Sequence, residues 1–404
     1  MSQREILFSW DNLWLILMGC IVFSNLSSII TMQIMHLPFS FNEMLLAPFV
    51  LLLWNRFKSF TLGGKFPLII CIVVVLILIA LAWGYFPFYP IISNARAWFY
   101  LFIGYFAFKN RNKITSDDLL FASLGMLIGW ALSALYNIFF VMPNLTTMEL
   151  NEKSVEATGV MMCIPIYFAM AFTKKGKLWL LLGLTLILFI CLFGGQRRIM
   201  VVSAVSVLAA FILSLRRNKS AIKRYVIIGG VVVAVFIALL PLAEAYIKDL
   251  SPMLHHRIFV RTEVLFTGGV EETGDDIRSN NIKLFFENIL EYSFPRGLVS
   301  LRTGIDKGTG IFNDLPFLML SWIYGWPITF FFVTVFLIRL KENISLYAKY
   351  GKDESIIAAS CLVVMFILLF LEGTYLTYAE SAVVTGAMLG RATRYSKKRN
   401  IILA

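Results

Sequence analysis

The chain has 404 residues, of which 59% are hydrophobic and only 15% are charged. Its net charge of +12 raises the question of a nucleic-acid partner. In so hydrophobic a chain, however, most lysines and arginines fall in short links between apolar segments. In such links these residues set the orientation of membrane helices and contact anionic headgroups. Because no motif that recognises RNA or DNA accompanies them, we predict membrane lipids as partners and no nucleic acid.

Long apolar segments with almost no charge recur along the chain, for example Phe66 to Phe86 and Val226 to Leu240. A helix needs about 20 apolar residues to cross a bilayer, so we interpret these segments as spans. The sequence therefore predicts an all-α polytopic membrane protein with about 12 transmembrane helices. The predicted helices cover residues 13–33, 38–55, 66–87, 91–109, 118–141, 156–173, 178–194, 199–215, 226–244, 314–338, 355–371 and 376–391.

The distribution of basic residues predicts how these helices are oriented. Residues 1–245 would hold helices 1–9, residues 246–313 a large loop, and residues 314–404 helices 10–12 with a basic tail. Lysine and arginine concentrate in every second short link and in the tail, whereas the links between these are nearly free of them. Because basic short links lie on the cytoplasmic side, we predict cytoplasmic termini and an external large loop.

One short outer link departs from this rule, the turn Gly194-Gly195-Gln196-Arg197-Arg198. Guanidinium groups bind phosphate oxygens in a bidentate manner, and this attraction strengthens at a desolvated membrane boundary. Arg197 and Arg198 would then bind an anionic substrate. The alternative is that both side chains reach lipid phosphates as an ordinary helix end.

Three further ionisable residues stand near the outer ends of predicted helices. Arg96 lies near the end of helix 4, and Glu43 and Glu156 lie near the starts of helices 2 and 6. Ionisable side chains at membrane depth usually face the interior of the bundle or a water-filled cavity, so these three are candidate substrate-binding residues. The alternative for each of them is an ordinary charge at the membrane interface.

The large loop contains a second group of candidate residues, His255, His256, Arg257 and Arg261. In a helix, Arg257 and Arg261 would share a face at i, i+4 spacing. Two like charges on one face are unfavourable unless an anion lies between them, which favours substrate binding. A solvated loop surface is the alternative.

Further along the loop, residues Ser279 to Tyr292 predict an amphipathic helix at the membrane interface or on the bundle. Its apolar residues recur at helical spacing: Ile282, Phe285, Phe286, Ile289 and Leu290. Arg278 precedes this helix, and Arg296 and Arg302 follow it around Pro295-Arg296-Gly297.

Asp314 stands where the loop re-enters the membrane as helix 10. A carboxylate in this place could act as a general base or orient a hydroxyl group. It could equally be the N-cap of helix 10, and both interpretations stay open.

Motifs for nucleotides, metals and other cofactors are absent from the sequence. There is no P-loop, no dinucleotide glycine fingerprint, no Asp-x-Asp and no His/Cys constellation. We therefore predict no metal and no cofactor. With a basic cluster outside and no nucleotide site, the donor is expected to be already activated and lipid-linked, as in a polyprenyl pyrophosphate sugar.

Taken together, these features resemble the O-antigen polymerase and ligase superfamily (Wzy-type polymerases). The turn at Gln196-Arg197-Arg198 is similar to an arginine signature of that family, and Arg278 followed by a helix and Pro295-Arg296-Gly297 resembles its loop. Asn313-Asp314 and the later Tyr324-Gly325-Trp326-Pro327 look like the start of helix 10 and its glycine turn. Ligases of the family carry a histidine near the start of helix 10, so Asp314 favours a polymerase.

The resemblance implies a GT-C-like, metal-independent glycosyltransferase in the bacterial inner membrane, with its active site on the periplasmic face. It implies a donor and an acceptor that are undecaprenyl pyrophosphate-linked oligosaccharides, and a chain-length regulator is a candidate protein partner. Arg197, Arg198 and Arg278 would neutralise the leaving pyrophosphate, and Asp314 or Glu43 would accept the proton. The alternatives are an O-antigen ligase that transfers the glycan to lipid A-core and a transporter or flippase of an anionic solute or lipid-linked glycan.

Overall fold

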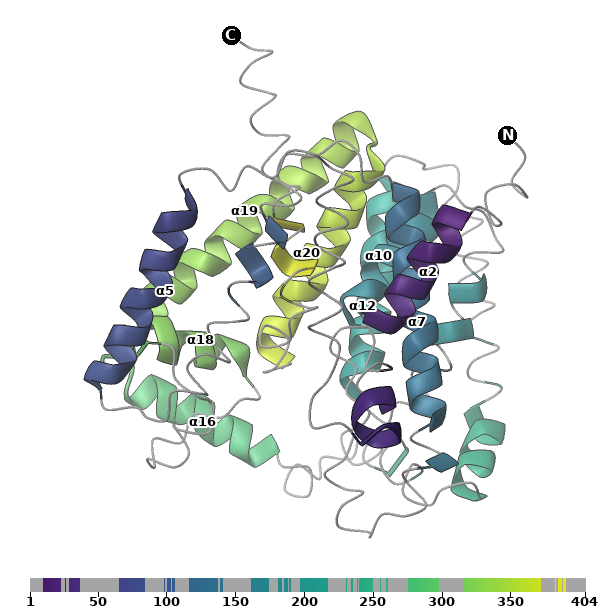
Figure 1. Ribbon diagram of the computed structural model, residues 1–404, viewed down its shortest axis with the longest axis horizontal. Coiled ribbons are helices and arrows are strands. Elements are labelled where there is room, and N and C mark those ends of the chain that lie inside the picture. The colour runs from purple at the N-terminus through teal and green to yellow at the C-terminus, as the bar shows by residue number, and fades with distance from the viewer. Residues whose placement is uncertain are drawn as a thin grey trace. The chain divides into compact units, whose positions relative to one another are not determined.

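Every element in the described part of the computed structural model is helical, and this part contains no strand (Figure 1). The structure describes residues 10–22, 29–36, 65–83, 116–136, 161–173, 197–216, 240–249, 275–297 and 315–371, with short pieces and single residues elsewhere between 26 and 389. Over these residues the predicted all-α fold is confirmed.

Two described helices are long and apolar enough to cross a membrane. One lies within α7 (Ser116–Tyr136) and the other within α20 (Asp353–Leu371). Shorter apolar helices occupy Asn12–Ile21, Cys71–Ala82, Cys163–Phe172 and Ile199–Leu215. These helices are a weak indication of a membrane protein, and the arrangement of 12 spans stays a prediction.

Several helices begin and end close to the positions that the apolar segments predict. The structure has α5 at Lys65–Ala82, α12 at Arg197–Leu215 and α20 at Asp353–Leu371. Pro67 lies in the first turn of α5, where a missing N–H costs no helical hydrogen bond. Because α12 begins at Arg197, the pair Arg197 and Arg198 forms the first two residues of this helix.

The prediction of one helix over residues 314–338 is wrong. The structure has two helices here, α18 (Pro316–Tyr324) and α19 (Trp326–Tyr350). Gly325 separates them with a φ of +80°, which interrupts the helical backbone. Phe317 and Phe330 have ring centroids only 5.5 Å apart, whereas 13 residues of a straight helix would span about 20 Å. The two helices therefore meet at a sharp bend.

Three other predicted boundaries also differ from the structure. The first predicted helix, residues 13–33, is shorter in the structure. Helix α2 (Trp10–Val22) ends at Val22, and a short π-helix, η1 (Ile29–Ile34), follows. Residues 240–249 are helical, so this helix continues beyond Tyr246, where the large loop was expected to begin. Helix α19 likewise continues past residue 338 through the basic segment that was expected to be a link, because good helix formers occupy it.

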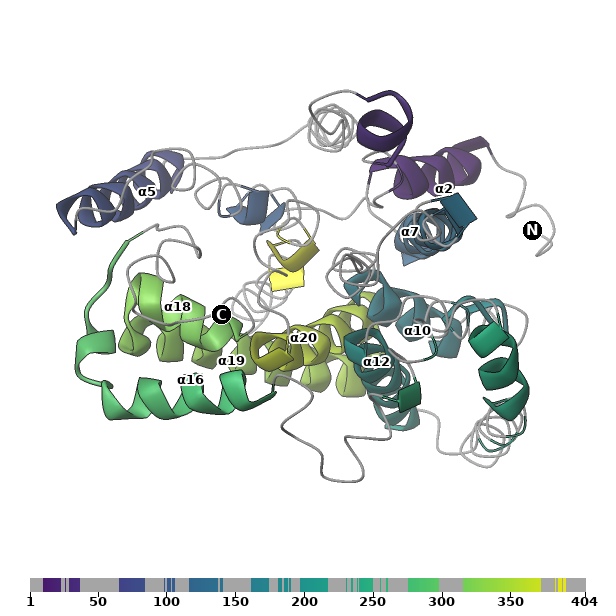
Figure 2. The same cartoon turned by 90° about the horizontal axis from the view of Figure 1, so that it is seen from below.

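The chain forms two compact units, each described by itself. The first unit comprises Met1–Phe49, Ile114–Thr273 and Leu346–Ser360, and the second comprises Val50–Lys113, Gly274–Ser345 and Cys361–Ala404. In the first unit α2 packs along α7, while α10 (Cys163–Thr173) packs against both α7 and α12 (Figures 1 and 2).

Two glycines allow α2 and α7 to touch through their backbones. A Cβ added at Gly19 would lie 2.3 Å from the carbonyl oxygen of Ala122, and one added at Gly125 would lie 2.1 Å from that of Ile16. Small residues serve this purpose in many membrane helix pairs, because they let two helix axes approach closely. The close packing of α2 on α7 therefore requires glycine, whose side chain is a single hydrogen atom, at both positions.

We predict that Gly125→Ala lowers the midpoint of thermal unfolding, because the added methyl group pushes α2 away from α7 at a cost of about 1–3 kcal/mol. The matched control is Gly230→Ala, since a Cβ at Gly230 would meet no described atom within 4 Å. The control should be neutral or slightly stabilising, as alanine is the better helix former. Equal unfolding midpoints for the two variants would contradict the close approach.

Candidate functional site

The second unit places the predicted loop helix beside α18 (Figures 1 and 2). This helix, α16, covers Asp275–Glu287 and is followed by a turn and the short 3-10 helix η7 (Glu291–Ser293). It confirms the expected helix, although it begins and ends earlier than predicted. Of its apolar stripe, Phe285 is buried and stacks on Tyr292 at 5.3 Å. The other members of the stripe are exposed: Ile282, Phe286, Ile289 and Leu290.

Immediately after η7, the side chain of Arg296 is buried among aromatic rings. Its guanidinium carbon lies 3.9 Å from the centroid of Trp322, 5.4 Å from that of Trp83 and 5.9 Å from that of Tyr292. Glu291 forms an ion pair with it, and its side chain is 58% exposed whereas that of Arg296 is only 5% exposed. We call these five residues the Arg296 cluster. Together they supply a counter-charge and three π faces to a cation removed from water.

The backbone of this turn is fixed against the end of α18. The N–H of Arg296 donates to the carbonyl oxygen of Ile323 at 3.1 Å, and the N–H of Gly297 donates to the same oxygen at 3.0 Å. Gly297 has a φ of +83°, and a Cβ there would lie 2.2 Å from the carbonyl oxygen of Leu76 and 2.5 Å from the nitrogen of Ala80. Only glycine fits both the conformation and the contact with α5, which explains the third residue of Pro295-Arg296-Gly297.

The bend between α18 and α19 holds the same loop from the other side. The indole N–H of Trp326 donates to the carbonyl oxygen of Ile289 at 3.0 Å. A Cβ at Gly325 would lie 2.4 Å from the carbonyl oxygen of Ser293, so the loop backbone lies directly on this glycine. The loop after α16 is therefore held by α5, by the end of α18 and by the start of α19.

Within the Arg296 cluster, Tyr292 is kept neutral and the carboxylate of Glu291 balances the charge of Arg296. Burial, with a further contribution from the carboxylate of Glu291, raises the pKa of Tyr292, and Arg296 lowers it by a smaller amount. Tyr292 therefore stays protonated at neutral pH. Because Glu291 and the three rings already surround Arg296, a phosphate could reach this guanidinium only by displacing Glu291. The cluster is thus suited to positioning the loop, and with it α16.

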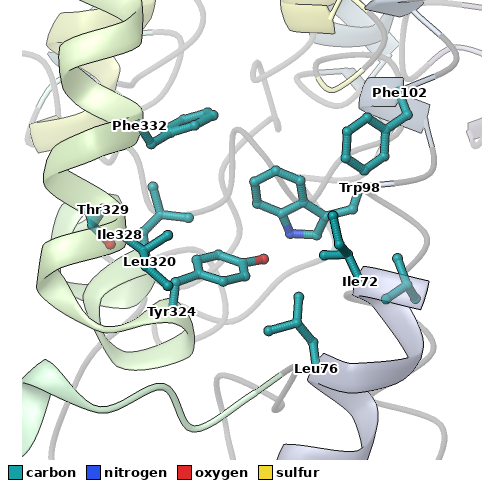
Figure 3. Close-up of a pocket in the computed structure, with 10 residues that line it drawn as sticks. Ile72, Leu76, Trp98, Phe102, Leu320, Tyr324, Ile328, Thr329 and Phe332 are labelled. Carbon is teal, nitrogen blue, oxygen red and sulfur yellow. The ribbon is translucent and has the colours of Figure 1, made fainter. Parts of the chain in front are cut away.

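An apolar pocket lies within the same unit (Figure 3). Its volume is about 250 Å³, and its walls come from α5, from the segment containing Trp98 and from α18 and α19. The ring of Trp98 meets that of Tyr324 edge to face at 5.2 Å and that of Phe332 at 6.1 Å. In Figure 3 the Tyr324 ring extends from α18 across the pocket toward Trp98 and Ile72. Its hydroxyl oxygen is buried and has no hydrogen-bond partner among the described residues.

The structure describes the backbone of three predicted site arginines. Arg197 and Arg198 begin α12 in the first unit, and Arg278 lies in the first turn of α16 in the second unit. The remaining predicted site residues, apart from His255, lie outside the described residues: Arg96, Glu43, Glu156, His256, Arg257, Arg261 and Asp314.

His255 is engaged with neighbours in its own unit. Its Nε2 lies 3.0 Å from Oε1 of Glu244, and its ring stacks on that of Phe259 at 5.5 Å. A carboxylate partner at this distance orients the imidazole and occupies one of its two nitrogen atoms. These contacts are sufficient to place His255 without a ligand.

Sequence reasoning placed Arg296 after the loop helix but gave it no role, and it gave no role to Tyr324. The signal available for Arg296 was an arginine between proline and glycine in an aromatic segment. Trp83, which completes the cluster, lies far away in the chain, so no local pattern could reveal it.

Within the described parts of the chain, no group of three or more His, Cys, Asp or Glu side chains could hold a metal ion.

Comparisons with protein-family models, with characterised proteins and with solved structures gave no match to this chain.

We predict that Arg296→Ala destabilises the protein by about 2 kcal/mol or more, because three rings lose their cation and a cavity opens among them. Arg296→Lys should recover only part of this loss, since an ammonium group lacks the planar surface that packs on Trp322. Thermal unfolding and near-UV circular dichroism of the tryptophans measure both effects.

The control for this experiment is Lys283→Ala on α16. Lys283 is exposed and its ion pair with Glu287 is 4.0 Å long, so its loss should change stability by less than about 0.5 kcal/mol. If Arg296→Ala were as mild as this control, the cluster would not hold the loop.

Proposed function

We propose that the chain is a polytopic membrane glycosyltransferase that polymerises a surface polysaccharide, such as O-antigen, from lipid-linked repeat units. The observation that carries this proposal is the position of Arg278. This arginine lies on the first turn of α16, and the other end of the same loop is locked to two further elements by the Arg296 cluster. A cation on so well held a helix is suited to binding an anionic group in a fixed place.

The arginine pair gives independent support to the proposal. Arg197 and Arg198 are the first two residues of α12, a helix that is apolar from Ile199 to Leu215. On the topology that the basic links predict, this end of α12 lies at the outer face of the membrane, where basic residues in short links are otherwise rare. An anionic substrate at this face accounts for the exception.

The proposed reaction is a glycosyl transfer at the periplasmic face of the bacterial inner membrane. A hydroxyl oxygen of the acceptor glycan attacks the anomeric carbon of an undecaprenyl pyrophosphate-linked oligosaccharide and forms the new glycosidic bond. The bond from that carbon to the pyrophosphate oxygen breaks, and the pyrophosphate leaves with both electrons. Arg197, Arg198 and Arg278 stabilise the charge of the leaving group, and Asp314 or Glu43 accepts the proton of the attacking hydroxyl.

We predict that Arg197→Ala and Arg278→Ala each reduce chain extension by about 10²–10³-fold, because each removes a cation from the departing pyrophosphate. The measurement uses purified protein in proteoliposomes with a lipid-linked repeat unit, and the product is sized on a gel. Lysine variants at both positions should keep part of the activity, since they preserve charge but not the bidentate geometry.

Lys283→Ala is the matched control for Arg278→Ala, because it also removes a cation from α16. It should extend chains at the wild-type rate with unchanged protein yield. Wild-type rates in both arginine variants would overturn the assignment. Supplying lipid A-core as a second acceptor separates a polymerase from a ligase, which would label that acceptor instead.

One observation favours a second candidate function, a transporter or flippase of an anionic solute or lipid-linked glycan. Interrupted helices are common at the substrate sites of transporters, and α18 and α19 form such an interrupted pair at Gly325. In that case labelled substrate would cross the proteoliposome membrane without any covalent product. The polymerase proposal instead requires a covalent product, a longer glycan that stays on one side of the proteoliposome membrane.

A further inference from the structure

We propose that α16 and the turn after it lie in the outer interface of the membrane, with one exposed apolar stripe inserted among the acyl chains of the lipid. The partner assigned to this surface is a bilayer of neutral lipid. The inference rests on the membrane placement that is part of the proposed function, but not on glycosyl transfer. It explains how the helix that carries Arg278 is supported on its outer side.

Two neighbouring sides of α16 make different contacts. One side is buried, and on it the ring of Phe285 meets that of Phe317 on α18 at 6.3 Å. The side next to it carries large apolar residues that stay exposed and continue into the turn. We call them the outer stripe: Ile282, Phe286, Ile289, Leu290 and Phe294. Phe286 is 64% exposed and Leu290 is 79% exposed, and apolar surface gathered in this way marks a protein or membrane contact.

The contacts of the following loop place the outer stripe beside the ends of two other helices. A Cβ at Gly297 would touch the backbone of Leu76 and Ala80, near the end of α5. On the other side, Trp326 is the first residue of α19 and bonds to the carbonyl oxygen of Ile289. On the predicted topology, α5 ends at the outer face and α19 enters the membrane from that face. Both contacts therefore place the loop at the outer membrane surface.

Two tryptophans from different helices lie at the same level. Trp83 directly follows α5, is half-exposed and packs on Arg296 of the loop. Trp326 holds the same loop through its indole N–H. Tryptophan is enriched where membrane meets water, because its ring is apolar and its N–H takes a polar partner. The pair indicates that the loop, and the stripe beside it, lie in this boundary.

The direction of α16 agrees with this placement. In Figure 1, α16 runs across the direction of α5 in the same unit, not along it. An amphipathic helix that lies in the interface crosses the direction of the membrane-spanning helices in this way. Its apolar side enters the boundary between headgroups and acyl chains by about 5–10 Å.

Lipid accounts for the outer stripe better than a second copy of the chain. The start of α19 has its own exposed apolar residues, Ile328, Phe330 and Phe331. Trp326, which touches the stripe at Ile289, meets the ring of Phe330 at 5.9 Å. The stripe is thus continuous with a surface that faces acyl chains in a membrane-spanning helix. A stable dimer would need about 800 Å² from each partner, more than one side of a short helix supplies.

The charges beside the outer stripe indicate that the lipid is neutral. Lys283 pairs with Glu287 at 4.0 Å, and Arg296 pairs with Glu291. The two pairs carry no net charge, so this part of the surface does not attract anionic headgroups. Burial of hydrocarbon drives the contact, and phosphatidylcholine is sufficient for it.

The test measures the depth of single nitroxide labels in nanodiscs of phosphatidylcholine. The labels are attached to Leu290→Cys and Phe286→Cys in the full chain, after its five native cysteines are replaced by alanine. Collisions with oxygen, which concentrates among acyl chains, are compared with collisions with a water-soluble nickel complex. We expect the ratio of oxygen to nickel collisions to be several-fold higher at both positions than at the control.

The matched control is Leu284→Cys, an exposed leucine on the same helix. Leu284 lies about 200° around the helix from Ile282, so its label should face water. Nickel collisions as frequent at Leu290 as at Leu284 would show a stripe in water and overturn the inference. Labels at Leu290 shielded from both reagents, with dipolar broadening between copies, would show a dimer and overturn it as well.

A second measurement keeps the native cysteines. Benzoylphenylalanine takes the place of Phe286 or Leu284, and the nanodiscs are irradiated. At Phe286 we expect a covalent adduct with phosphatidylcholine, detected by mass spectrometry, and at Leu284 little or none. A crosslink between two copies at Phe286 in place of the lipid adduct would contradict the assigned partner.

The outcome is independent of the polymerase proposal. Arg197→Ala should lose chain extension and keep the depth of the label at Leu290. A protein that never extends chains but keeps this label among acyl chains refutes the proposed function alone. A protein that extends chains while the label stays in water refutes the interfacial position of α16 alone.

Discussion

The second unit depends on keeping one guanidinium group out of water. Removing a cation from water is costly unless a counter-charge and favourable contacts replace its hydration. Arg296 obtains these from Glu291, from the face of Trp322 and from two further rings. Because these partners come from η7, α18 and the end of α5, the guanidinium can be buried only when all three elements are in place. Burial of the Arg296 side chain thereby holds the loop after α16 in place.

The cluster and the apolar pocket use the same elements in different ways. Leu76 lines the pocket with its side chain, and its carbonyl oxygen lies against Gly297. Trp322 and Tyr324 are two residues apart on α18, so they point to different sides of the helix, one to the cation and one to the pocket. A change that loosens the cluster should therefore alter the shape of the pocket as well.

The sequence predicts most of the described helices, because long apolar segments such as those of α5, α12 and α20 have few alternatives to a helix. The apolar pattern did not predict the interruption at Gly325, since hydrophobic residues continue across it and a single glycine is tolerated in a helix. Only the resemblance to a known family pointed to a glycine turn at this position. The interruption is decided by the loop backbone that lies on this glycine. The Arg296 cluster escaped prediction for a similar reason, as Trp83 and Arg296 are distant in the chain and no periodic pattern links them.

The contact between Leu76 and Gly297 has a consequence for how the protein is made. These residues are more than 200 positions apart, and the second unit is assembled from three separate stretches of chain. At a synthesis rate of about 5–20 residues per second, α5 emerges on the order of 10–40 s before the glycine against which it packs. During this interval its partners do not exist, so the apolar surface of α5 must be covered by something other than its final neighbours. The second unit therefore completes late in translation, and slowing the ribosome between the two segments prolongs the time for which this helix has no partner.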